Sequence, residues 1–284
     1  MHAMLKQRIL TAIVLLALLV PAVLATNPLG FVVLTALLMG AGGWEWARLN
    51  GLAAAASLAT AALCAALCGV LWFSGLAASA VPWVWFLAGA AWVGLALWLL
   101  RAGVAAWLPQ PVVLRWLGGV ALLCAAWLAL VQARLVGIDF LFSVLLLVWV
   151  ADVAAYFSGR ALGGRFFKQK LAPSISPGKT WEGVAGAMVG VLCMAFAWRS
   201  LDVAGLAPGG SLYSRLGSVN PLFLTVSVVF LTTMGVVGDL LESLFKRAAG
   251  VKDSGVLLPG HGGVLDRIDA LLPVLPLAML LCTL

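Results

Sequence analysis

Long apolar runs separated by short polar breaks dominate the chain. A membrane core of about 30 Å is crossed by a helix of about 20 apolar residues. Nine runs approach this length: residues 8–25, 29–46, 52–74, 80–100, 114–133, 137–157, 182–201, 220–245 and 264–284. The breaks between them carry Pro, Gly, Asn or charged residues, which commonly end helices. The pattern predicts an all-α, polytopic integral membrane protein with about nine transmembrane helices.

Composition supports this class and excludes others. Of the 284 residues, 64% are hydrophobic and 10% are charged, whereas soluble domains have about 45–50% apolar and about 25% charged residues. An ordinary soluble enzyme, a disordered chain and a disulfide-stapled secreted domain are therefore excluded. The five cysteines lie in apolar stretches without metal-ligand spacing, so we interpret them as membrane-core residues. In such a protein the net charge of +7 indicates basic loops or an anionic ligand, with no nucleic-acid partner expected.

The basic residues also predict an orientation. If the nine spans alternate, 14 of the 17 Lys and Arg residues fall on the side of the N-terminus, and only Arg134, Arg199 and Arg215 fall on the other. Lys and Arg concentrate in cytoplasmic loops. We therefore expect a cytoplasmic N-terminus in the cell (inner) membrane. The first run also has features of a signal peptide, but Pro21 and its length favour a retained anchor.

Acidic residues are distributed unevenly. Residues 1–151 contain only Glu45 and Asp139, and the other eight acids follow. Ionisable groups in or beside membrane helices are costly and usually functional. We predict that residues 1–135 form a transmembrane scaffold of about five helices. Residues 136–284 would form a catalytic region with cytoplasmic loops 158–181 and 246–263.

A first polar cluster surrounds the loop at 158–181. Asp152 and Tyr156 are four residues apart and so share a helix face. The loop adds glycines, hydroxyl groups and five basic residues, a composition that suits phosphate binding. Ser176 to Thr180 resembles the end of a P-loop, but no strand precedes it and the upstream glycine spacing is wrong. The alternative interpretation is a basic loop that only fixes topology.

A second cluster lies at the end of the eighth span. Asp239, Glu242 and Lys246 have i, i+3, i+7 spacing and are predicted to share a face, with Ser243 and Arg247 beside them. Glycines one turn earlier would let a neighbouring helix or ligand approach. A simple salt-bridge pattern at a helix end would explain Glu242 with Lys246. It would not explain the deeper Asp239.

The third cluster is a glycine turn that leads into the last span. Its Gly262 and Gly263 leave backbone N–H groups free for an anion at the start of the following helix. The charged and imidazole residues of this cluster are Lys252, Asp253, His261, Asp266, Arg267 and Asp269. Together the three clusters are typical of a site for a metal-bound polyphosphate. Carboxylates suit Mg²⁺, whereas zinc would require His and Cys ligands. The membrane location indicates that one substrate is a lipid.

The third cluster and the end of the second resemble the signature of a known family. The matching residues in the segment 243–269 are Ser243, Phe245, Lys246, Arg247, Lys252, Asp253, Gly255, Leu258, Pro259, His261, Gly262, Gly263, Val264, Asp266, Arg267, Ile268 and Asp269. This pattern is similar to that of the phosphatidate cytidylyltransferases, also called CDP-diacylglycerol synthases. The resemblance implies transfer of CMP from CTP to phosphatidic acid, giving CDP-diacylglycerol and pyrophosphate for phospholipid synthesis.

The resemblance also implies roles for single residues. Asp239 and Asp266 would bind Mg²⁺, with a second cation such as K⁺ beside it. The residues expected to hold phosphates are Lys179, Lys246, Arg247, Lys252 and Arg267. Those expected to orient ligands or contact the nucleotide are Asp253, His261 and Asp269, and those expected to shape the opposite wall are Asp152, Tyr156, Ser176 and Glu182. The expected partners are CTP, phosphatidic acid, the bilayer and a second copy of the chain.

Other functions remain open at this point. A CTP-dependent lipid kinase would transfer the γ-phosphate to a lipid alcohol and use similar residue types. A transporter would place its acids near mid-membrane in two matching halves, whereas here they crowd one end of one half. The aspartate pattern of the CDP-alcohol phosphotransferases is not found.

Overall fold

The computed structural model describes residues 2–206 and 210–283, and this part of the chain forms helices and loops without a β-strand. The helices are α1 (His2–Leu24), α2 (Leu29–Leu49), α3 (Ala54–Phe73), α4 (Pro82–Ala102), α5 (Val112–Val136), α6 (Ile138–Leu162), α7 (Trp181–Val203), α8 (Leu212–Val219), α9 (Pro221–Ala248), α10 (Leu265–Ile268) and α11 (Leu271–Leu281), with short 3₁₀ turns η1 (Leu76–Ala78) and η2 (Val104–Ala106). The prediction of an all-α fold is confirmed.

In the part of the chain that the structure describes, seven helices are long and apolar enough to cross a membrane: α2 to α7 and α9. The protein is therefore an integral membrane protein. The described apolar part of α1 is the shorter stretch Leu10–Leu24. The side chains of Lys6 and Arg8, two of the 14 basic residues assigned to the side of the N-terminus, lie outside the described residues. The short helix α8, held by Asp202 through the Ser211 and Ser214 hydroxyls, was not predicted.

The last predicted span, 264–284, is not one continuous helix. It consists of α10, with four residues, and α11, with eleven. At 1.5 Å per residue, α11 is about 16 Å long, about half of the hydrocarbon core. Pro273 has no N–H to donate to the carbonyl of Asp269 and its ring crowds that carbonyl, which explains the break between α10 and α11. Hydropathy alone does not detect this interruption.

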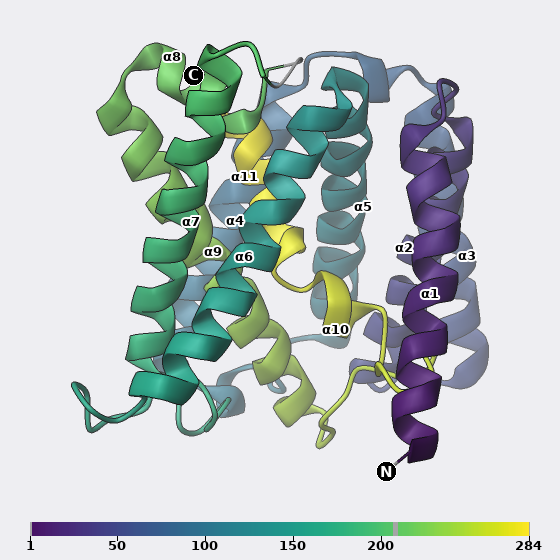
Figure 1. Ribbon diagram of the computed structural model, residues 1–284. Helices are drawn as coiled ribbons and strands as arrows, with labels where there is room; N and C mark the ends of the chain where they lie inside the picture. The colour runs from purple at the N-terminus through teal and green to yellow at the C-terminus, as the bar shows by residue number, and fades with distance from the viewer. Residues whose placement is uncertain (1, 207–209, 284) are drawn as a thin grey trace.

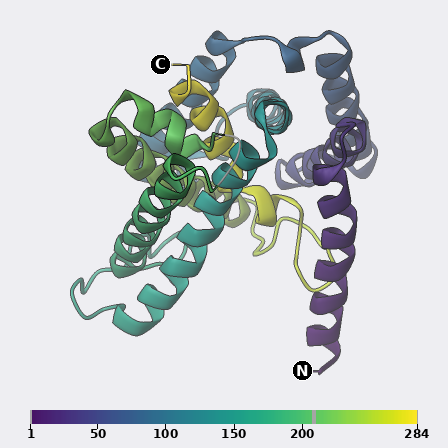
Figure 2. The ribbon, with the colours of Figure 1, turned by 45° about the horizontal axis from the view of Figure 1, so that its top comes forward.

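The long helices run roughly parallel, with the N-terminus at the lower end of Figure 1 and the C-terminus near the upper end. The long connections before α7 and α10 both lie at the lower end, as does the η2 segment (Figure 1). In Figure 2, α1–α3 occupy one side and α6–α9 the other, with α10 and α11 between them. Polar segments that are far apart in the sequence therefore meet at one end of the bundle.

Aromatic side chains join the N-terminal and C-terminal parts at this lower end. The ring of Phe245 on α9 packs against Trp46 of α2 at 5.2 Å and against Trp107 after η2 at 4.4 Å between centroids. Trp46 also donates a hydrogen bond from Nε1 to the carbonyl of Trp116 at 3.2 Å. These contacts fix the end of α9, which carries most of the candidate site.

Candidate active site

Lys246 lies at the centre of the candidate site. Its ammonium group is 2.6 Å from Oδ1 of Asp266 and also forms an ion pair with Glu242 one turn earlier on α9. All three residues are largely buried, with 11%, 7% and 6% of their side chains exposed in that order. Buried charges persist when they are paired and hydrogen-bonded. The structure thus joins the second and third sequence clusters through one cation.

Asp266 closes the glycine turn. Its Oδ2 accepts hydrogen bonds from the backbone N–H groups of Ser254 at 3.0 Å and Gly263 at 2.8 Å. Burial alone would raise the pKa of Asp266, but the bonds from Lys246 and the two backbone groups outweigh it and lower the pKa below its ordinary value. The Gly263 N–H, which sequence reasoning left free for a ligand anion, is therefore occupied by this carboxylate.

A carboxylate from the N-terminal part completes the turn. Glu45 of α2 has no exposed surface. Its Oε1 accepts a hydrogen bond from Val264 N, and its Oε2 accepts bonds from Leu265 N and the Ser254 hydroxyl, at 2.9–3.0 Å. Sequence reasoning did not include Glu45 in the site. The available signal was a carboxylate inside an apolar span, a costly placement that usually has a function.

Two signature glycines make room for Glu45. A Cβ at Gly255 would lie 2.5 Å from Oε1 of Glu45, and one at Gly263 would lie 2.6 Å from both carboxylate oxygens. Gly262 has φ of +83°, in the left-handed region that favours glycine. These positions therefore exclude side chains because the turn closes tightly over one buried carboxylate.

A second group of charges lines a cavity of about 570 Å³ between α6, α7 and α9. Lys179 Nζ is 2.5 Å from Asp239 Oδ2. Asp152 and Tyr156 line the same cavity, which confirms that they share a face and places them opposite Asp239. Asp152 interacts electrostatically with Asp239, Lys179 and Arg267. The predicted common face of α9 is thus divided, with Asp239 toward this cavity and Glu242 toward Lys246.

Asp269 belongs to this second group, because α9 approaches the break between α10 and α11 closely. A Cβ at Gly238 would lie 2.5 Å from the Asp269 carbonyl oxygen and 2.8 Å from the Pro273 ring. The close approach predicted for the α9 glycines is therefore confirmed. Burial, followed by the negative charge of Asp239, raises the pKa of Asp269. The acids at 152, 239 and 269 create an excess of negative charge that favours a cation.

Glu182 organises the loop before α7. Its Oε1 accepts hydrogen bonds from the backbone N–H groups of Gly164, Phe166 and Phe167 at 3.0–3.1 Å. Thr180 caps α7 by accepting a hydrogen bond from Gly183 N at 3.1 Å. Glu182 therefore shapes the wall of the site by holding the loop, and Thr180 fixes the turn that presents Lys179.

The remaining candidates lie around these two groups. Arg247 donates to the carbonyls of Ile175 at 3.4 Å and Val251 at 3.0 Å, and so ties the loop that contains Ser176 to the end of α9. Lys252 and Asp253 are exposed. Nδ1 of His261 is buried without a hydrogen-bond partner among the described residues, and the His261 carbonyl accepts a bond from Arg267 Nε at 3.0 Å.

Of the two predicted carboxylate ligands, Asp239 and Asp266, the surroundings of Asp239 suit a hard cation better. Mg²⁺ usually takes one or two carboxylates and completes its shell with phosphate oxygens and water. No three Asp, Glu, His or Cys residues of the described chain are grouped so that they could hold an ion by themselves. Oδ1 of Asp239 has only a 3.4 Å contact with the Ser243 hydroxyl. At Asp266 a cation would compete with Lys246 and two N–H groups.

Comparison with known proteins places this geometry in a family. Residues 6–284 match the model of the cytidylyltransferase family. The chain belongs to this family. Phosphatidate cytidylyltransferase of Pseudomonas aeruginosa is 40% identical over 277 residues, covering 96% of this chain and 95% of that protein. Proteins of the same name from Haemophilus influenzae and Bacillus subtilis are 46% and 41% identical over 140 residues, covering 49% of this chain and 44% and 46% of their own lengths.

Membership of the cytidylyltransferase family confirms the resemblance of the segment 243–269 and identifies the protein as an enzyme. The family match also includes the N-terminal part, where the sequence alone showed only hydropathy. Glu45 and the Trp46 ring connect that part to the signature turn. The N-terminal helices of this cytidylyltransferase thus contribute directly to the order of its candidate site.

Proposed function

We propose that this protein transfers CMP from CTP to phosphatidic acid, giving CDP-diacylglycerol and pyrophosphate. The observation that carries the proposal is the meeting of the signature turn, locked through Lys246 and Asp266, with the charged cavity around Lys179 and Asp239 at one end of the bundle. The shared name of the relatives supports the same substrates. The membrane location supports a lipid as one of them.

The reaction requires charge neutralisation more than proton transfer. An oxygen of the lipid phosphate attacks the α-phosphorus of CTP, and the bond from that phosphorus to the oxygen bridging the β-phosphate breaks. The electron pair leaves with pyrophosphate. Because the lipid phosphate is already ionised near neutral pH, the step needs no strong general base. We therefore give His261 a role in nucleotide contact rather than in proton transfer.

The cations of the site are proposed to hold the phosphates. Lys179 and Lys246 each form an ion pair with a carboxylate, which positions each ammonium group for a phosphate oxygen. Arg247, Lys252 and Arg267 of the segment 243–269 are proposed to bind further phosphate oxygens. Phosphoryl-type transfers depend mainly on such positioning and charge stabilisation. Asp253 and Asp269 would orient the ligands held by these cations.

We further propose Mg²⁺ as the cofactor, with Asp239 and Asp266 as its carboxylate ligands. When bound, the ion would neutralise the triphosphate and the departing pyrophosphate, and a second cation such as K⁺ would assist it. Asp239 offers the more accessible oxygens, with 36% of its side chain exposed. Asp266, whose Oδ1 is paired with Lys246, would be the second carboxylate ligand.

The proposed location of the site is the cytoplasmic face of the inner membrane. The segments 158–181 and 246–263, which hold eight of the 17 Lys and Arg residues, lie at one end of the bundle (Figure 1), and Lys and Arg concentrate on the cytoplasmic side. CTP would enter from this side.

A homodimer through the N-terminal helices belongs to the same proposal and is checked by the mass of the purified protein in detergent.

The test is an assay with CTP labelled in the cytidine ring. Purified protein with Mg²⁺ and phosphatidic acid should release pyrophosphate and yield labelled, chloroform-soluble lipid. A lipid kinase would leave the label in water-soluble CDP, and that result would overturn the proposal.

Asp266→Asn should lower turnover by about a hundredfold or more, since an electrostatic contact in the site is lost. Asp139→Asn, at the opposite end of the bundle, should retain normal turnover.

A further inference from the structure

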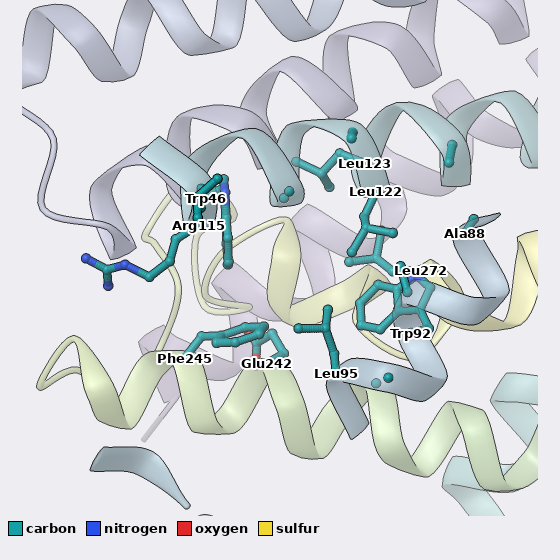
Figure 3. A pocket seen from close by; sticks show the side chains of 18 of the residues that line it. Trp46, Ala88, Trp92, Leu95, Arg115, Leu122, Leu123, Glu242, Phe245 and Leu272 are labelled. Carbon is teal, nitrogen blue, oxygen red and sulfur yellow. The ribbon is translucent and has the colours of Figure 1, made fainter. Parts of the chain in front are cut away.

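A larger cavity, of about 700 Å³, borders a different face of α9. Its walls come from α2, α4, α5, α9 and α11, and most of its lining side chains are apolar or aromatic. Figure 3 shows Trp92, Leu95 and Leu122 at one end, with Arg115 extending toward the other. Arg115 and Glu242 are its two charged lining residues. A cavity of this kind suits an amphiphile with one anionic end.

The cavity is long enough for one leaflet of the membrane. Its lining along α5 runs from Leu114 to Ala125, which corresponds to about 16 Å of helix. One leaflet contributes about half of a 30 Å hydrocarbon core. Leu114 lies near the start of α5, at the same end of the bundle as the candidate active site (Figure 1). The apolar part therefore extends from that membrane surface toward the bilayer centre.

Arg115 is a buried cation without an ion pair from the described chain. Only 6% of the residue is exposed, and its Nε and Nη1 atoms are buried without a hydrogen-bond partner among the described residues. No Asp or Glu in the described chain forms an ion pair with it. Its guanidinium lies 5.7 Å from the Trp107 ring centroid, a contact that offsets only part of the cost of a buried cation.

We propose that this cavity is the acyl-chain subsite for an anionic lipid and that Arg115 binds the lipid phosphate. The inference rests on the proposed function, in which phosphatidic acid is the lipid substrate. A guanidinium presents several N–H donors to phosphate oxygens and is suited to a phosphate at a membrane surface. The apolar walls then hold a chain of the same molecule, so one site recognises both the head and the tail.

The position of the cavity connects it to the chemistry. Glu242 lines the cavity and forms an ion pair with Lys246, which binds Asp266. Gly238 also lines it, next to Asp239, which faces the smaller cavity. The larger cavity and the charged cavity thus border each other along α9 between Gly238 and Glu242.

The first test changes the charge. Arg115→Gln should raise the KM for phosphatidic acid at least about tenfold, because a buried charge contact is lost, and should leave the KM for CTP unchanged. Arg115→Lys should restore part of the affinity. Arg101→Gln removes an equal charge at the exposed end of α4 and serves as the matched control. Equal lipid KM values for Arg115→Gln and Arg101→Gln would overturn the assignment of Arg115.

The second test fills the apolar part. Gly118 lines the cavity, and a Cβ there would meet no atom within 4 Å. Gly118→Leu should raise the KM for long-chain phosphatidic acid more than that for a short-chain form. Gly69→Leu adds the same side chain to α3 at an equally open position outside both cavities. If both variants treat the two lipids alike, the acyl-chain subsite is wrong.

A binding measurement separates this inference from the proposed function. Native mass spectrometry of the protein in detergent should show phosphatidic acid bound to the wild type and largely lost in Arg115→Gln, whether or not the enzyme turns over. Phosphatidylglycerol should bind more weakly, and equal binding of the two lipids would contradict recognition of the substrate phosphate. A wild type that binds phosphatidic acid through Arg115 but makes no CDP-diacylglycerol would overturn the function and leave the subsite standing.

Discussion

At the scale of the residue, Glu45 is a carboxylate that orders a turn 209 to 220 residues away in the chain. It accepts three hydrogen bonds from Ser254, Val264 and Leu265 while fully buried. Such bonds are individually modest, but a buried donor left without a partner costs about 1–3 kcal/mol. Glu45 therefore acts as a positioning residue for the turn that carries Asp266.

Replacing Glu45 should uncouple the turn from α2. Glu45→Ala leaves three donors unpaired and should lower kcat at least about tenfold, with a lower thermal unfolding temperature in detergent. Glu45→Gln keeps one acceptor oxygen and should have an intermediate kcat. Asp139→Asn, which changes the other acid of residues 1–151, should match the wild type in both measurements. Wild-type kcat in Glu45→Ala would show that the turn keeps its shape without this carboxylate.

The sequence identifies the residues of this site better than their partners. The signature spacing singles out Lys246, Asp266 and the glycines, because each is fixed by local turn and helix geometry. It does not reveal Glu45 or Arg115, since their contacts depend on which helices become neighbours. An acid within the span 29–46 is a usable signal for Glu45. Arg115 is indistinguishable in sequence from the other basic residues near span ends.

At the scale of the element, the approach of α9 to the α10–α11 break assembles the acidic group. Hydropathy predicted the ends of α9 within a few residues, because its apolar run is bounded by Asn220 and by a basic cluster. The same method predicted one span for 264–284, where Pro273 interrupts the backbone. The carbonyl of Asp269 packs against Gly238. The break therefore places Asp269 near Asp239.

A methyl group at Gly238 should separate these elements. Gly238→Ala places a Cβ 2.5 Å from the Asp269 carbonyl oxygen, and overpacking of this kind costs about 1–3 kcal/mol. We expect a lower unfolding temperature and a lower kcat, measured in detergent. Gly69→Ala adds the same methyl group to α3 in open space and gains about 1 kcal/mol of helix propensity. If both variants behave alike, close packing at Gly238 is not needed.

At the scale of the whole molecule, the charged residues gather at one end of an apolar bundle. The two long connections, 163–180 and 249–264, lie at this end together with the starts of α3, α5 and α7 (Figure 1). Arg134, Arg199 and Arg215 belong to segments at the other end. The charge asymmetry read from the sequence thus corresponds to a physical asymmetry of the fold. Which end faces the cytoplasm is a separate prediction of the positive-inside rule.

Cysteine labelling at the two ends decides this orientation. Val256, in the loop before α10, is 83% exposed, and Val203, at the end of α7, is 77% exposed. In a background without the five native cysteines, Val256→Cys should react with an impermeant maleimide in inside-out vesicles but not in intact spheroplasts. Val203→Cys should show the reverse, because α7 begins at the end of the bundle that carries Val256 and ends, at Val203, at the other end (Figure 1). Labelling of Val256→Cys from outside the cell would separate the site from cytoplasmic CTP, and the proposed function would then fail on topology alone.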